Sequence, residues 1–151
     1  MKIAYFSPLN PERSGISDYS EELLPYLAQY ADIDIFIEEY KPSNLEIAEA
    51  FEIFPARDFP ALRRERRYDT CLYHMGNSPF HEYLYPYLLK YPGVSILHEP
   101  KLHHFFYDIT LGRGKASGYI REMSYCYGPE GAELAREVLA QSCPPPFFEY
   151  S

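Results

Sequence analysis

The segment at residues 68–100, YDTCLYHMGNSPFHEYLYPYLLKYPGVSILHEP, constrains the fold most, because it combines strand, turn, helix, turn and strand patterns in about 33 residues. Residues 70–75 and 94–97 are short apolar runs that are typical of buried parallel strands. Between them, the Ser-Pro pair at 78–79 favours a helix start and the Pro-Gly pair at 92–93 favours its end. The segment therefore predicts one complete βαβ unit.

The rest of the chain repeats this alternation of apolar strands and helices. Further strands are predicted at residues 2–6, 33–37 and 51–54, and helices at 44–50, 58–68, 101–107, 119–127 and 130–141. Another helix is expected from about residue 18, with one apolar face made by Ile16, Tyr19, Leu23, Leu27 and Tyr30. Strands of this kind alternating with helices predict an α/β fold with an open, doubly wound, mostly parallel, Rossmann-like sheet of roughly four or five strands.

The composition limits the classes of function. The chain has 151 residues, of which 46% are hydrophobic, so one substantial core and a single domain are expected. A formal net charge of −8 gives no general attraction for a phosphate backbone, and nucleic acid is not expected as a partner. No apolar run approaches the roughly 20 residues that cross a bilayer, and a soluble, cytoplasmic protein is expected. The arginine-rich segment 63–67 is either a solvated helix face or a patch for peripheral membrane contact or an acidic ligand.

Polar residues that can bind a ligand follow both strands of the βαβ unit. Asn77 and His81 come after its first strand, and His98 and Glu99 come after its second. The carboxyl ends of parallel strands share the edge of the sheet where ligands bind, so hydrogen bonds to a sugar or phosphate oxygen are expected there. Structural interpretations stay open for these residues: a turn former, a surface histidine, or a strand-end histidine satisfied by the backbone.

The loop after the first strand of the chain, SPLNPERSGIS, leads into a helix N-terminus. Such a terminus presents unpaired N–H groups and a positive dipole end, which favour a phosphate, a carboxylate or a sugar hydroxyl. Gly15 is a candidate for close approach of a ligand to the backbone, and the alternative is a simple loop residue. The loop matches neither GxGxxG nor GxxxxGK[ST], so neither a dinucleotide site nor a P-loop is inferred.

Metal and nucleophilic chemistry have less support in the sequence. His98, Glu99, His103 and His104 lie close together, but their spacing differs from the HExxH pattern and Pro100 interrupts them. A metal hydrolase therefore remains only a third interpretation, and no metal or cofactor is expected. No serine lies in a GxSxG sequence and no cysteine has an adjacent base, so nucleophilic catalysis is not indicated.

Three segments together resemble a known family. They are KIAYFSPLNPERSGISDYSEELLPYLA, YHMGNSPFHEYLYPYL and YPGVSILHEPKLHHFF. The combination resembles the N-terminal domain of family-4-like glycosyltransferases of the GT-B fold, over about residues 2 to 128. The resemblance implies the acceptor-side half of a GT-B enzyme, which faces a second Rossmann-like domain that holds a nucleotide-sugar. It also implies hexosyltransferase-like transfer of a glycosyl group with retention of configuration, usually without a bound metal.

The resemblance also implies roles for individual residues. Gly15 matches the loop that approaches the donor phosphates, and Asn77 and His81 match the polar turn that lines the acceptor side. His98 matches a catalytic histidine that contacts the transferred sugar. Glu99 stands where the subfamily more often has Asp, so its longer side chain is expected to change the reach into the cleft.

The sequence ends without the second domain that this resemblance implies. No strand follows the last predicted helices, and residues 142–151 are rich in proline and aromatic side chains, so a truncated chain without its C-terminal nucleotide-sugar-binding domain is expected. The expected partners are a nucleotide-sugar donor, an unidentified acceptor and that missing domain, and the chain alone is expected to be inactive. The competing interpretation is a non-catalytic sugar- or nucleotide-binding module.

Overall fold

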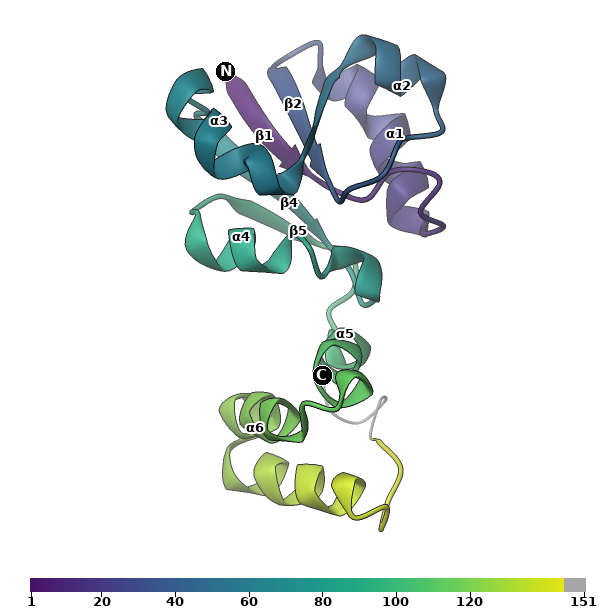
Figure 1. Ribbon diagram of the computed structural model, residues 1–151, viewed down its shortest axis with the longest axis vertical. Helices are drawn as coiled ribbons and strands as arrows, with labels where there is room; N and C mark the ends of the chain where they lie inside the picture. Colours follow the sequence, from purple (N-terminus) through teal and green to yellow (C-terminus); the bar gives the residue numbers. More distant parts are fainter. Residues whose placement is uncertain (146–151) are drawn as a thin grey trace. The chain divides into compact units, whose positions relative to one another are not determined.

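The computed structural model describes residues 1–145, which divide into two compact units. Unit 1 comprises Met1–Gly76 and Phe80–His98, and unit 2 comprises Asn77–Pro79 and the chain from Glu99 onward. Figure 1 shows a sheet in unit 1 and helices in unit 2. The last part of the proline-rich tail, residues 146–151, lies outside the described residues.

Unit 1 is built around one parallel sheet. Its strands are β1 (Lys2–Phe6), β2 (Asp32–Ile37), β3 (Glu52–Pro55), β4 (Thr70–Met75) and β5 (Val94–Leu97). Their order is β3-β2-β1-β4-β5, and all four neighbouring pairs are parallel. The chain thus adds strands first on one side of β1 and then on the other, which confirms the predicted Rossmann-like, doubly wound sheet.

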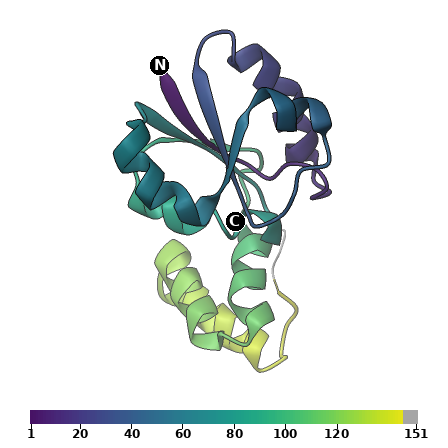
Figure 2. The same cartoon turned by 45° about the horizontal axis from the view of Figure 1, so that its top comes forward.

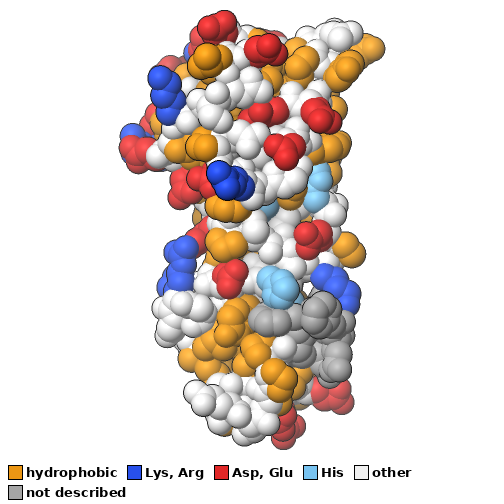
Figure 3. Space-filling model, turned by 90° about the vertical axis from the view of Figure 1, so that its right-hand side faces the viewer, with side chains coloured by type: hydrophobic (Ala, Val, Ile, Leu, Met, Phe, Trp, Pro, Cys, Tyr) orange, Lys and Arg blue, Asp and Glu red, His pale blue; other side chains and the backbone are white. Residues whose placement is uncertain are grey.

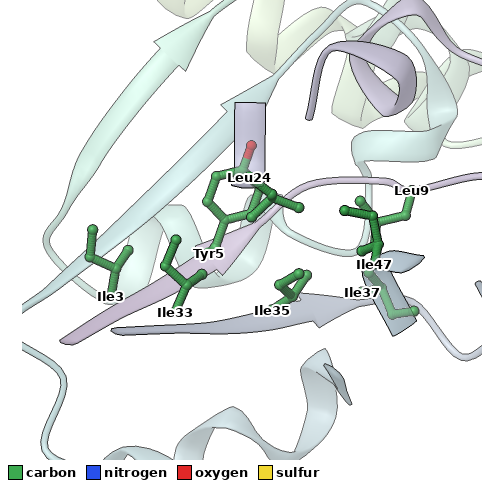
Figure 4. Close-up of a cluster of buried hydrophobic side chains, with 8 residues drawn as sticks. All are labelled: Ile3, Tyr5, Leu9, Leu24, Ile33, Ile35, Ile37 and Ile47. Atoms are coloured by element: carbon green, nitrogen blue, oxygen red, sulfur yellow. The ribbon is translucent and has the colours of Figure 1, made fainter. Parts of the chain in front are cut away.

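Helices cover both faces of this sheet (Figures 1 and 2). The helical segments along this part of the chain are α1 (Gly15–Leu27), α2 (Leu45–Ala50), η1 (Ala56–Asp58), α3 (Phe59–Arg66), η2 (Pro79–His81) and α4 (Tyr85–Lys90). Figure 4 shows isoleucines of β1 and β2 gathered with Leu24 of α1 and Ile47 of α2 in one buried cluster. On the opposite face, Phe6 stacks on Phe36 at 5.0 Å between ring centroids and meets Phe59 of α3 edge-on. Two apolar layers therefore hold the sheet.

The predicted apolar face of α1 is confirmed at Leu27, which packs against the buried cluster, and is wrong at Tyr19 and Tyr30. The helix begins at Gly15, about three residues earlier than expected, with Ser14 as its N-cap. Tyr19, which was assigned to the apolar face, is 44% exposed. The buried side chains of the helix are Ser17, Ser20 and Leu24. Ser20 can be buried because its hydroxyl accepts a hydrogen bond from the Tyr5 hydroxyl of β1 at 3.0 Å.

The βαβ segment departs from the prediction at two points. The single helix expected between its strands is split into η2 and α4, and Pro86 stands in the first turn of α4, where its missing N–H costs nothing. β5 was expected to be buried, but Val94 and Leu97 are each 55% exposed. The reason is topological, since β5 is an edge strand with β4 as its one neighbour in the sheet.

Unit 2 is helical within its described residues. Its longer elements are α5 (His103–Ile109), η3 (Leu111–Arg113) and α6 (Ala116–Leu139). α6 is interrupted at Gly128, whose φ of 66° lies in the left-handed region that favours glycine, so the chain forms the two successive helices that the sequence predicts. Tyr119, Met123, Ala135 and Val138 form its buried cluster. Within residues 1–145, no helix combines the length and apolarity needed to cross a bilayer.

A buried carboxylate ties four segments of unit 1 together. Asp34 of β2 is 1% exposed, and its oxygens lie 3.0 Å from both Lys2 Nζ and the Arg66 guanidinium. The Tyr68 hydroxyl donates a further hydrogen bond to the same carboxylate. A buried charge is tolerated when several donors replace its hydration, so this group stabilises the sheet only as long as the carboxylate is present.

We expect Asp34→Ala to lower the free energy of unfolding by about 3 kcal/mol, because it leaves the two cations and the Tyr68 hydroxyl without their shared acceptor. Urea unfolding followed by circular dichroism measures this change. Asp32→Ala is the matched control: Asp32 also pairs with Lys2, at 2.8 Å, but it is exposed, so its loss should cost less than about 1 kcal/mol. Equal effects of the two substitutions would contradict this account of Asp34.

Candidate functional site

The candidate site lies where the strand order of unit 1 reverses. β1 and β4 are neighbours in the sheet, while the chain continues from β1 to β2 on one side and from β4 to β5 on the other. In open α/β sheets, ligands bind outside the carboxyl ends of the strands at such a point. α1 follows β1 here, and the parallel register pairs Tyr5 with Leu72 and Phe6 with Tyr73. The next residue of β4, His74, therefore shares the α1 face with Tyr5.

Two histidines of neighbouring strands are hydrogen-bonded at this edge. Nδ1 of His74, in β4, lies 2.9 Å from Nε2 of His98, which follows β5. The backbone N–H of His98 also donates to the Met75 carbonyl at 3.0 Å, so strand pairing continues one residue beyond β5. Backbone and side chain together fix His98 in place, with its side chain half-buried.

The environment of His74 disfavours its charged form. Its side chain is 0% exposed, and this burial lowers its pKa to about 3, with the positive charges of His98 and His81 acting in the same direction. Burial also lowers the pKa of His98. Among the described residues, Nε2 of His74 has no hydrogen-bond partner. Both rings are therefore neutral near pH 7, and one buried polar atom is not satisfied by the part of the protein that the structure describes.

Aromatic and hydroxyl groups surround the histidine pair. The Tyr5 ring packs on His74 at 4.7 Å between centroids, and the Tyr19 ring of α1 meets His98 edge-on at 5.0 Å. Below them, the hydroxyls of Ser7 and Ser20 are 2.7 Å apart, and both side chains are buried. The site thus offers neutral hydrogen-bonding groups beside a partly exposed aromatic ring.

His81 belongs to the same unit and is buried, so its interpretation as a surface histidine is wrong. It is 1% exposed and lies in η2, against the end of β4. A Cβ atom added to Gly76 would lie 2.9 Å from the His81 ring and 2.3 Å from the end of the Ile16 side chain, so these side chains would have to move to admit a larger residue. The glycine after β4 therefore lets the His81 ring pack directly against the strand end.

The remaining predicted site residues occupy different settings. Gly15 is the exposed first residue of α1, with open space where its Cβ would be, so no contact among residues 1–145 requires a glycine there. Asn77 and Glu99 belong to unit 2, whereas Gly15, His81 and His98 belong to unit 1.

Asn77 has a structural role within unit 2. Its side-chain oxygen accepts a hydrogen bond from the backbone N–H of Phe105 in the first turn of α5, at 2.8 Å. This contact satisfies one of the N–H groups that a helix start leaves unpaired. Glu99 is exposed. The Asn77 contact was not predictable from local sequence, because its partner lies 28 residues further along the chain.

The residues considered for a metal site are divided between the two units. His98 belongs to unit 1, and His103 and His104 belong to unit 2. His103 is buried, with Nε2 hydrogen-bonded to the Tyr119 hydroxyl at 3.0 Å beside a largely apolar hollow of about 190 Å³. Within residues 1–145, no group of three His, Cys, Asp or Glu side chains is placed to hold a metal ion. His103 is thus engaged in the packing of unit 2.

Two hollows of unit 1 also lie at the carboxyl ends of its strands. One of about 420 Å³ is lined by residues 37–42 and 53–55 with Ala48 and Phe51, and another of about 210 Å³ includes Arg57 and Tyr83. Neither is lined by the histidine pair. They provide space, whereas His74 and His98 provide convergent, incompletely satisfied polar groups, which define a binding site more specifically than volume does.

His74 is the residue that the sequence analysis missed. It lies inside residues 70–75, which were interpreted only as an apolar strand. A histidine near the carboxyl end of a buried strand is itself a signal, because burying imidazole is costly without a partner. Counting alternate residues along β4 would have placed it on one face of the sheet.

Comparison with protein-family models, with curated proteins and with solved structures finds no match.

The lowered pKa of His74 predicts acid-sensitive stability. The unfolded chain binds a proton at this side chain below about pH 6.5, whereas the folded protein binds it only near pH 3. The contribution of neutral His74 to the free energy of unfolding is therefore fully present above pH 6.5 and is lost as the pH falls towards 3. From pH 7 to 4.5 this contribution amounts to about 2 to 3 kcal/mol. The side chain of His74→Asn does not titrate. Between pH 7 and 4.5 we therefore expect its free energy of unfolding, measured with urea, to fall by about 2 to 3 kcal/mol less than that of wild type.

The same comparison between pH 7.5 and 8.5 is the control, because His74 is neutral there in both folded and unfolded chains. Wild type and His74→Asn should then show parallel stabilities. An equal loss of stability on acidification in both proteins would show that His74 is not responsible.

Proposed function

We propose that this chain is the acceptor-side domain of a glycosyltransferase, which transfers a sugar from a nucleotide-sugar to an acceptor. The observation that carries the proposal is the hydrogen-bonded pair of His74 and His98 at the carboxyl ends of β4 and β5, beside the point where the strand order reverses. A neutral imidazole at such an edge, here the half-buried ring of His98, is suited to hydrogen-bond a hydroxyl of a sugar. The resemblance of the GNSPFH and LHEP segments to family-4-like glycosyltransferases is consistent with this role.

The ring of Tyr19 supports a sugar as the ligand. It lies beside His98 and is partly exposed, so an aromatic surface adjoins a hydrogen-bonding nitrogen. Sugars present apolar C–H faces as well as hydroxyls, and both kinds of surface find a counterpart here. A small apolar ligand would leave the polar groups unsatisfied, and an inorganic anion would gain nothing from the negative face of the ring.

The charges around the site favour an acceptor hydroxyl over a free phosphate. The loop between β1 and α1 is held by carboxylates: Glu21 accepts from the Asn10 backbone N–H at 2.8 Å, and Asp18 accepts from the Asn10 side chain at 2.9 Å. Figure 3 shows further acidic side chains spread over a surface of the molecule. Nearby carboxylates raise the cost of bringing a phosphate to this helix start.

A non-catalytic sugar-binding module is the second candidate, because the same pair can bind a sugar without promoting transfer. Measurement of transfer separates the two functions. In the full gene product, a panel of nucleotide-sugars tests turnover, and titration of methyl glycosides tests binding. Binding of glycosides with no turnover for any nucleotide-sugar would favour the binding module.

We expect His98→Ala to lower the turnover of the full gene product by about 100-fold, which corresponds to loss of a hydrogen bond made to the reacting sugar. His104→Ala is the matched control, since His104 is a histidine of unit 2 and should leave turnover within about twofold of wild type. Equal turnover of wild type and His98→Ala would remove His98 from the mechanism.

A further inference from the structure

We propose that His74 is a positioning residue that sets the tautomer of His98, so that His98 presents Nδ1–H to its ligand as a hydrogen-bond donor. His74 belongs to no sequence motif. Its role in sugar binding rests on the proposed function, whereas its effect on the tautomer of His98 does not. The geometry that carries it is the contact of 2.9 Å between His74 Nδ1 and His98 Nε2.

One ring nitrogen of His98 is available to a ligand. Its Nε2 is engaged by His74, and its backbone N–H is engaged by the Met75 carbonyl. Rotation of the ring would break the bond to His74, and the Tyr19 ring lies edge-on against it at 5.0 Å. Nδ1 is therefore the nitrogen of His98 that remains for a ligand.

The hydrogen bond between the two rings decides which nitrogen of each imidazole carries the proton. In a neutral imidazole one nitrogen is a donor and the other an acceptor, and the hydrogen bond at one nitrogen decides the state of the other. Nε2 of His74 is buried and has no partner among the described residues. A buried N–H without an acceptor is less favourable than a bare nitrogen, so the proton of His74 belongs on Nδ1, where it donates to His98. His98 must then carry its own proton on Nδ1.

The histidine pair is not suited to relay a proton. A relay would place the positive charge on His74, whose ring is 0% exposed and packed against Tyr5. Burial holds the pKa of His74 at about 3, so it does not accept a proton from His98 near neutral pH. His74 therefore orients His98 and does not store a proton. His98 in turn acts on a sugar by donating to a hydroxyl or ring oxygen.

Two matched substitutions separate this role from a merely structural one. The side-chain amide of asparagine reaches the position of histidine Nδ1, and that of glutamine reaches the position of Nε2. His74→Asn therefore keeps a donor facing His98, whereas His74→Gln keeps the polarity of the site but removes that donor. If His74 served only to fill space or add polarity, the two variants would behave alike.

The experiment is two-bond ¹H–¹⁵N correlation NMR of the imidazole rings of the 151-residue chain at pH 7.5, without added ligand. We expect His98 to carry its proton on Nδ1 in wild type and in His74→Asn, and to shift to the Nε2–H form in His74→Gln. A wild-type His98 protonated on Nε2, or the same tautomer in both variants, would overturn the proposal. The wild-type spectrum decides the assignment even where a variant fails to fold.

A second readout connects the tautomer to function. In the full gene product, His74→Gln should lower turnover roughly tenfold, as expected for one hydrogen bond, and His74→Asn should restore it to within about threefold of wild type. Absent turnover in wild type would remove the proposed function but leave the tautomer result standing. Turnover equal in both variants, with the expected tautomers observed, would show that positioning does not serve transfer.

Discussion

The parallel pairing of β1 with β4 is the constraint on which unit 1 depends. β1 lies at the centre of the sheet, and the chain departs from it in both directions, so its two neighbours bring together segments that are far apart in sequence. The register sets Tyr5 opposite Leu72, and the next residue on the same face of β4 is His74. Strand order and register, more than any local motif, thus bring the ring of Tyr5 to 4.7 Å from that of His74.

The cost of burying a polar side chain is offset in two different ways in unit 1. The Asp34 carboxylate is surrounded by Lys2, Arg66 and the Tyr68 hydroxyl, which replace its hydration. His74 gives up its charge instead, and a single neutral hydrogen bond to His98 replaces the hydration of one nitrogen. The first solution ties strands together and stabilises them. The second leaves one nitrogen unsatisfied within the described chain, which is typical of groups retained for binding or catalysis.

The sequence predicted the strands of the sheet because their signals are local. The runs at 70–75 and 94–97 match β4 and β5, since apolar residues bounded by turn residues define both ends. The apolar face of α1 was predicted only in part, because burial of Ser20 depends on the Tyr5 hydroxyl, a partner that helical periodicity does not show. The pairing of His74 with His98 likewise required the order of β4 and β5, which a linear pattern does not give.

The neutrality of the histidine pair limits what unit 1 could contribute to the proposed sugar transfer. A nucleotide leaving group develops negative charge on its phosphates, and stabilising that charge requires cations or helix N-termini aimed at it. His74 and His98 are neutral near pH 7, and the loop before α1 is braced by Asp18 and Glu21. An imidazole that donates to a sugar oxygen can orient the sugar but does not balance a diphosphate. For the proposed transfer to occur, the compensating positive charge must therefore come from groups other than the histidine pair.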